Sequence, residues 1–166
     1  MTTRNHAWYA VIAGPMIFCA AGAAFAAEGA SHGQNMAQMK FVNFPGMPSC
    51  TTGSVQNGDP TKGPSIILAK AAKGCTFPWH WHTPSEHLMM VSGSALMEGK
   101  DGSALTLKPG GFAMMPSKHI HRFRCTSACA LYLYADAPFD IHYVDAQENE
   151  LSPDDALKAV KEKVGK

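Results

Sequence analysis

Two histidines and a glutamate lie close together near the middle of the sequence, at a spacing that suits metal binding. His80 and His82 are separated by one residue, and Glu86 follows after the turn-forming residues Thr83-Pro84-Ser85. Successive side chains on a strand alternate between its two faces, so His80 and His82 are predicted to point the same way. The turn would let the next strand return the Glu86 carboxylate beside both imidazoles. Mn, Fe, Ni, Cu and Zn all accept such ligands.

The elements that must position these residues are predicted to be short β-strands. From residue 41 onward, short apolar runs alternate with Gly, Pro, Asn and Asp, which is typical of an all-β chain. Strands are expected at 53–56, 65–71, 77–81, 86–91, 94–97, 104–107, 111–115, 119–124, 130–134 and 139–144. This spacing indicates a sandwich or a closed barrel.

One helix is expected at the C-terminus, over residues 149–166. Ser152 is a suitable N-cap, Pro153 suits the first helical position, and Asp154 and Asp155 suit the positive end of the helix dipole. Apolar residues then recur at helical spacing. We expect this helix to pack on the outside of the β-structure.

The histidine motif resembles the first of the two motifs of the cupin superfamily. Gly74, His80, His82, Glu86 and Gly93 occur at the intervals of that motif. The match is more specific than a histidine pair alone, because five positions agree in type and spacing.

The second cupin motif is matched in part, and the resemblance covers roughly residues 50–145. Gly110, Pro116 and His121 fit, whereas Lys118 stands where the motif has Gly and Cys125 where it has Asn. The resemblance implies an all-β, cupin-type jelly-roll barrel over residues 40–148. It also implies one divalent transition metal inside the barrel, Mn, Fe, Ni, Cu or Zn, held by the four residues His80, His82, Glu86 and His121.

Further site residues are predicted by their position relative to the ligands. If Glu86 and His121 point inward, strand alternation brings Met90 and Phe123 inward as well. His119 shares a face with His121 and is expected either to support a ligand or contact substrate, or to be a buried structural histidine. The walls would be largely apolar, which suits a small apolar or aromatic ligand.

The N-terminal 26 residues predict a cleavable signal peptide. Arg4 precedes an apolar run over 7–26, which ends in the small-x-small pattern Ala24-Phe25-Ala26. The alternative is an uncleaved membrane anchor, but the run is near the lower limit for a span and the cleavage pattern decides against it. We therefore expect a periplasmic or secreted protein without a stable membrane span after cleavage. Residues 27–39 are small and polar, and are expected to form a flexible arm.

Four cysteines remain after removal of the signal peptide, and an exported chain permits disulfides. Cys125 and Cys129 bracket a three-residue turn between two predicted strands, where opposed residues lie within bridging distance. We favour Cys125–Cys129 together with Cys50–Cys75. Free buried thiols are one alternative, and a thiolate metal ligand from Cys75 or Cys125 is another.

Several classes of function stay open at this point. The formal net charge of +1 comes without a basic stripe, so nucleic-acid binding is not expected. The resemblance favours a dioxygenase-type oxidoreductase acting on a small enol, diketone or aromatic compound, with Glu86 as the catalytic base and lyase or isomerase chemistry next. The alternatives are a non-catalytic small-molecule-binding or sensing protein and a metal-handling envelope protein. A homodimer is a further expectation from the resemblance.

Overall fold

The computed structural model describes residues 31–164, so the predicted signal peptide over 1–26 lies outside the described residues. The predicted arm over 27–39 contains a short 3-10 helix, η1 (Met36–Gln38). The strands are β1 (Thr51–Gly58), β2 (Ser65–Ala71), β3 (Thr76–Trp81), β4 (Glu86–Ser92), β5 (Ala95–Gly99), β6 (Ala104–Leu107), β7 (Phe112–Met115), β8 (His121–Cys125), β9 (Cys129–Ala135), β10 (His142–Val144) and β11 (Glu150–Leu151). Helix α1 (Pro153–Val164) follows.

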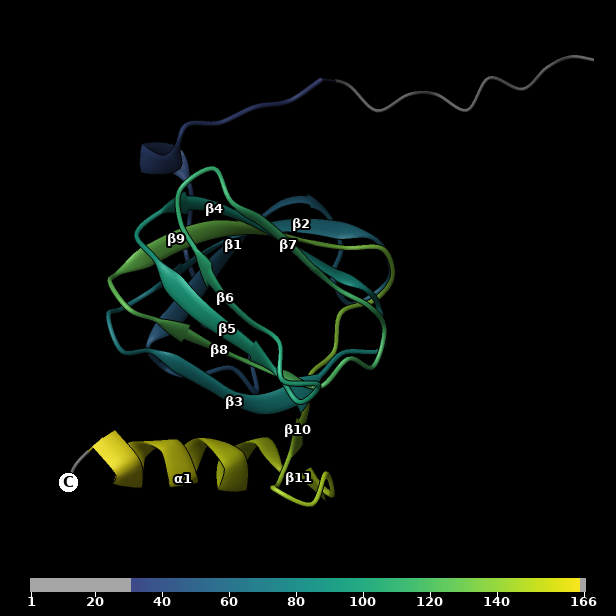
Figure 1. The fold of residues 1–166 in the computed structure, drawn as a ribbon. Coiled ribbons are helices and arrows are strands. Elements are labelled where there is room, and N and C mark those ends of the chain that lie inside the picture. Colours follow the sequence, from purple (N-terminus) through teal and green to yellow (C-terminus); the bar gives the residue numbers. More distant parts are fainter. Residues whose placement is uncertain (1–30, 165–166) are drawn as a thin grey trace, which may run out of the picture. The chain divides into compact units, whose positions relative to one another are not determined.

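The strands form two antiparallel sheets that face each other and enclose an interior (Figure 1). One sheet has the order β1-β2-β9-β4-β7, and the other has the order β11-β10-β3-β8-β5-β6. This is the all-β jelly-roll architecture that the resemblance implied. Across residues 31–164, none of the helices has the length and apolar character needed to cross a membrane.

Strand alternation sorts the side chains between the interior and the outer faces, as the sequence predicted. On β4, Glu86, Leu88 and Met90 are buried, while Met89 between them is exposed. On β8 the buried positions likewise alternate, beginning at His121. The two strands therefore present one side chain in two to the barrel interior.

Most strands differ from their predicted limits by a few residues, and β11 was not predicted. The strand expected at 119–124 begins at His121, because the backbone N–H of His119 donates to the carbonyl of Pro116 and closes a turn. In the C-terminal segment predicted over 149–166, Glu150–Leu151 pairs with β10, and the helix begins at Pro153, the predicted first helical position. The predicted cap is present, since Ser152 Oγ accepts a hydrogen bond from the Asp155 N–H at 3.2 Å.

Helix α1 lies outside the barrel, against β3 and β10 (Figure 1). Its Ala156 is almost completely buried there. The helix thus covers part of the outer face of the six-stranded sheet, as expected from its apolar spacing.

Both predicted disulfides are present. Cys50 is bonded to Cys75 and Cys125 to Cys129. Neither the free thiols nor the thiolate ligand considered as alternatives therefore applies to these cysteines. The Cys125–Cys129 bond lies in a packed apolar cluster in the barrel interior, which contains Leu88, Met90, Ala95, Met97, Leu107, Ala113, Met115, Phe123, Cys125, Cys129 and Leu131.

Candidate metal centre

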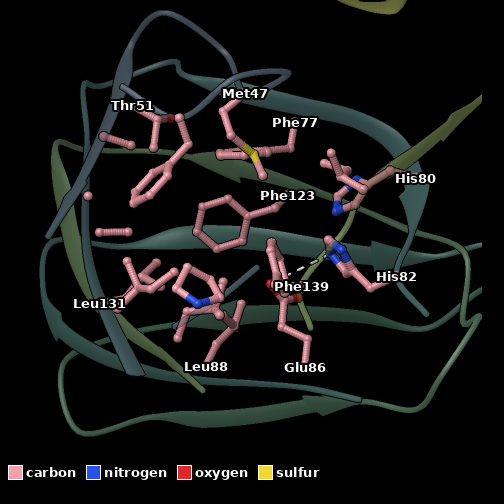
Figure 2. Close-up of a pocket in the computed structure, with 18 of the residues that line it drawn as sticks. Met47, Thr51, Phe77, His80, His82, Glu86, Leu88, Phe123, Leu131 and Phe139 are labelled. Carbon is pink, nitrogen blue, oxygen red and sulfur yellow. Dashed lines mark ion pairs between the residues drawn. The ribbon is translucent and has the colours of Figure 1, made fainter. Parts of the chain in front are cut away.

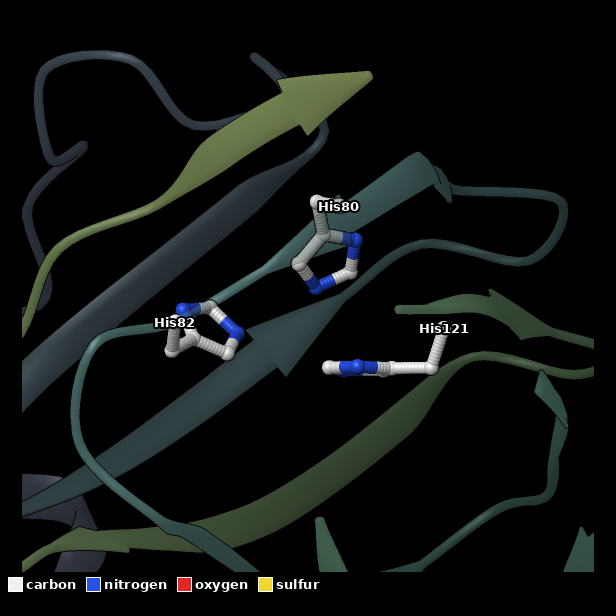
Figure 3. Close-up of side chains that lie close together, drawn as sticks. All are labelled: His80, His82 and His121. Atoms are coloured by element: carbon white, nitrogen blue, oxygen red, sulfur yellow. The ribbon is translucent and has the colours of Figure 1, made fainter. Parts of the chain in front are cut away.

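Three histidines from two distant parts of the chain converge inside the barrel. His80 lies near the end of β3, His82 follows that strand, and His121 is the first residue of β8. His80 is paired directly with His121 across the two strands. One ring nitrogen from each histidine lies within 4.8 Å of the others, and all three side chains are buried (Figure 3).

Glu86 completes the group from the opposite sheet, because β4 begins at this residue. One carboxylate oxygen lies 3.3 Å from His121 Nε2. The other lies 3.7 Å from Nε2 of His82, which is labelled with Glu86 in Figure 2. The structure thus brings together all four residues that were predicted as ligands.

The second nitrogen of each imidazole is held by a backbone carbonyl. His80 Nδ1 lies 2.6 Å from the Pro78 oxygen, His121 Nδ1 lies 2.9 Å from the His119 oxygen, and His82 Nδ1 contacts the Asp140 oxygen. A carbonyl can only accept, so each Nδ1 carries a proton, and Nε2 is the ring nitrogen left for a metal. This is the arrangement that metal-binding histidines commonly adopt.

An unpaired polar atom tests whether the site fits a metal. His82 Nε2 is buried and has no hydrogen-bond partner among the residues that the structure describes. Burying a polar atom without a partner is costly, and such atoms are rare in native proteins. A bound transition metal would satisfy this lone pair, and three imidazoles with one carboxylate are a suitable donor set.

The protonation states also suit metal binding. Burial lowers the pKa of His80 well below its ordinary value, with the neighbouring His121 and His82 acting in the same direction. Burial likewise lowers the pKa of His82. Burial alone would raise the pKa of Glu86, but His82 and His121 outweigh it and hold the pKa below the usual value. Near neutral pH His80 and His82 are neutral and Glu86 is ionised, which metal binding requires.

The other predicted site residues occupy different places. Phe123 lines the cavity beside the histidines, whereas Met90 lies in the packed apolar cluster. The ring of His119 is half-buried, with its centroid 6.2 Å from that of His121. His119 supports His121 through its backbone carbonyl, so a ligand-supporting contact exists but does not involve the ring.

A cavity of about 280 Å³ extends from the four polar residues along the inner face of the barrel (Figure 2). Its walls are mainly apolar and include Phe44, Met47, Ile67, Phe77, Leu88, Phe123, Leu131, Leu133, Phe139 and Ile141. The ring of Phe139 stacks on His82 with centroids 4.5 Å apart. A ligand bound there would meet polar groups at one end and hydrocarbon along most of its length.

Sequence reasoning missed the contributions of two loops to this cavity. Phe44 and Met47 precede β1, and Phe139 and Ile141 precede β10. The apolar alternation of Phe139 and Ile141 was a usable signal, since it places both on one face of an extended segment. The segment around Phe44 carries no such periodicity.

Comparisons with known proteins agree with this fold. Residues 67–134 match the cupin domain family. The polyketide cyclase RemF from Streptomyces resistomycificus has a similar structure, with a TM-score of 0.61, 17% identity, and coverage of 75% of this chain and 90% of that one. A search of curated proteins finds no match.

Two further solved structures are similar at comparable levels. A proposed acetylacetone dioxygenase from Methylibium petroleiphilum has a TM-score of 0.57 at 14% identity, covering 74% of this chain and 86% of that one. An RmlC-like cupin from Shewanella frigidimarina has a TM-score of 0.55 at 17% identity, covering 66% and 92% respectively. At these identities the likeness concerns the fold.

Proposed function

This chain belongs to the cupin superfamily, and from that premise we propose that it is an exported, mononuclear metal-dependent dioxygenase. Its substrate is a small, largely apolar enol, diketone or aromatic compound. The observation that carries this proposal is the convergence of three imidazoles and one carboxylate at the wall of an apolar cavity.

The ligands in this proposal are His80, His82, Glu86 and His121. A redox-active divalent metal bound by them supplies a Lewis acid for substrate oxygens and a route for electrons to O2. The donor set fits Mn, Fe, Ni, Cu or Zn. Lyase or isomerase chemistry is the corresponding expectation for a redox-inactive ion.

Glu86 is the residue placed to move a proton. It is buried and lines the cavity, and its neighbours His82 and His121 favour the ionised form by lowering its pKa. A carboxylate in this position can accept a proton from an enol or from an acidic C–H of a bound substrate. The surrounding apolar walls exclude water from that transfer and orient the substrate by its polar end.

Two features of the chain support export to the periplasm or the exterior. The N-terminal 26 residues have the pattern of a cleavable signal peptide. The two disulfides support the same proposal, because disulfides persist in oxidising compartments.

The proposal is tested by oxygen consumption. The chain, purified after export and loaded with Fe or Mn, is expected to consume O2 with at least one member of a panel of β-diketones, enols and catechols. Glu86→Gln should abolish this uptake. Glu98→Gln is the matched control, because Glu98 pairs with Arg122 at 2.7 Å, outside the metal site, and should keep the activity.

One result would contradict catalysis but still support ligand binding in the cavity. If panel compounds raised the melting temperature but gave neither O2 uptake nor product, the protein would be a binding or sensing cupin.

A further inference from the structure

The three histidines of the metal centre are supported in different ways. His80 and His121 donate to carbonyls two residues earlier in their own segments, those of Pro78 and His119. His82 donates instead to the carbonyl of Asp140, which lies 58 residues further along the chain. The ring orientation of His82 therefore depends on a separate segment, whereas the other two rings are held locally.

Asp140 holds this region of the chain with its side chain as well. Its Oδ1 accepts a hydrogen bond from the backbone N–H of Thr83 at 2.7 Å, so Asp140 contacts both His82 and the first residue of the turn. Its Oδ2 lies 3.3 Å from Nε2 of His142. The Asp140 carboxylate thus connects the backbone beyond His82 to the start of β10.

His142 is itself fixed from two sides. Its ring stacks on Trp81, with centroids 3.9 Å apart and planes inclined by 5°. Its Nδ1 lies 3.5 Å from a carboxylate oxygen of Glu150. Trp81 is the last residue of β3 and directly precedes His82, so both ends of this chain of contacts lie at the end of that strand.

We propose that Asp140 is a positioning residue for His82, and that its carboxylate keeps its own backbone carbonyl in place as the acceptor for His82 Nδ1–H. With that acceptor fixed, His82 stays in the tautomer that leaves Nε2 unprotonated toward the centre. The expected effect of Asp140 on metal binding rests on the proposed metal site. The claim about the His82 ring holds in the metal-free chain.

The first test needs no metal. Long-range ¹⁵N–¹H spectra of the metal-free chain with labelled histidine report which ring nitrogen carries the proton. In the wild type, His80, His82 and His121 are expected as Nδ1–H tautomers. In Asp140→Ala, His82 alone should lose the single Nδ1–H form, and Asp140→Asn should restore it, because the amide oxygen can still accept from the Thr83 N–H.

The second test measures Co²⁺ affinity and the d–d absorption spectrum of the full chain. Asp140→Ala should weaken binding about 10- to 100-fold and change the spectrum, the range found for groups that support metal ligands. Asp136→Ala is the matched control, since Asp136 accepts from the Ser85 N–H of the same turn at 3.2 Å. It should leave affinity and spectrum unchanged.

The outcomes separate the two proposals. An unchanged His82 tautomer and an unchanged Co²⁺ affinity in Asp140→Ala would overturn the positioning role. Equal losses in Asp136→Ala would overturn it too, because general turn stability would then explain the effect. A wild-type chain that bound no Co²⁺ would contradict the proposed metal centre, and the NMR result alone would decide the role of Asp140.

Discussion

Strands β4 and β8 each have a polar end, which carries a candidate metal ligand, and a packed end, which carries an apolar residue, and both ends face the barrel interior. On β4, Glu86 lines the cavity and Met90 belongs to the packed cluster. On β8, His121 and Cys125 show the same division. These four residues are all at most 5% exposed, so burial does not distinguish the two ends. Only the chemistry of the buried groups does.

The buried groups at the two ends contribute differently to the stability of the barrel. Burial of apolar side chains at the packed end stabilises the fold, whereas burial of imidazoles and a carboxylate costs stability because these groups lose hydration. Residues that oppose the local folding preference are expected at functional sites. Truncating a side chain at the polar end should therefore reduce metal binding, and truncating one at the packed end should reduce the free energy of unfolding.

The largest effect is expected for a ligand substitution at the polar end. His82→Ala should reduce the metal content from about one ion per chain to background, because it removes one donor and leaves the site open to water. The barrel should still fold, since the His82 ring loses only the hydrogen bond from Nδ1 to the Asp140 carbonyl, and its Nε2 makes none within the described part of the chain. Elemental analysis and circular dichroism measure the two outcomes. Full metal content in this variant would refute the ligand assignment.

The converse effect is expected at the packed end. Met90→Ala should lower the free energy of unfolding by about 2–5 kcal/mol, because it leaves a cavity among well-packed side chains. Metal content per folded chain should stay at the wild-type value. Urea unfolding and elemental analysis of the folded fraction test this, and a lost metal with intact stability would remove the distinction between the two ends.

The polar end should also make the metal-free chain sensitive to acid. Burial lowers the pKa of His80 and His82, so these groups protonate more readily in the unfolded state than in the folded state. The free energy of unfolding is therefore at its full value above about pH 6.5. It falls as the pH drops below that value, by up to about 1.4 kcal/mol per pH unit for each histidine. The lowered pKa of Glu86 extends the loss to lower pH.

Thermal unfolding of the metal-free chain between pH 8 and pH 5 measures this dependence. His80→Gln should flatten the profile, and Met90→Ala should shift it downward without changing its shape. A pH profile that His80→Gln leaves unchanged would contradict the assignment of the acid sensitivity to the polar end.

The smallest effect concerns the turn that leads into β8. Lys118 has a φ of 62°, a conformation that favours glycine, which is the residue of the cupin motif at this position. Lys118→Gly should stabilise the chain by about 0.5–1 kcal/mol and leave metal binding unchanged. Lys73→Gly, in a turn where Gly74 already has the positive φ, is the control and should not stabilise. Urea unfolding distinguishes them.

The convergence of His80, His82 and Glu86 could be predicted from the sequence because strand geometry leaves little freedom. One residue between His80 and His82 fixes a common face, and a short turn returns Glu86 to them. The limits of β2 and β6 also agreed residue for residue, since clear turn residues flank both strands. Alternation along β4 placed Met90 inward correctly.

Other features of the site left no sequence signal. Strand alternation does not distinguish an inward side chain that lines a cavity from one in a packed cluster, because this depends on the opposite sheet. Met90 was therefore predicted at the site, although it lies in the packed cluster. The supports of the three imidazoles are backbone carbonyls, and every residue type carries one. The role of Asp140 arises from a contact across 58 residues, which only the fold brings together.

The central claim is that His80, His82, Glu86 and His121 hold a single metal ion. Anomalous diffraction from crystals of the metal-loaded chain, collected at the absorption edge of that metal, tests it most directly. We expect one peak about 2.0–2.2 Å from Nε2 of the three histidines and from a Glu86 oxygen. A metal-loaded crystal with its peak elsewhere, or with none within bonding distance of these atoms, would contradict the account.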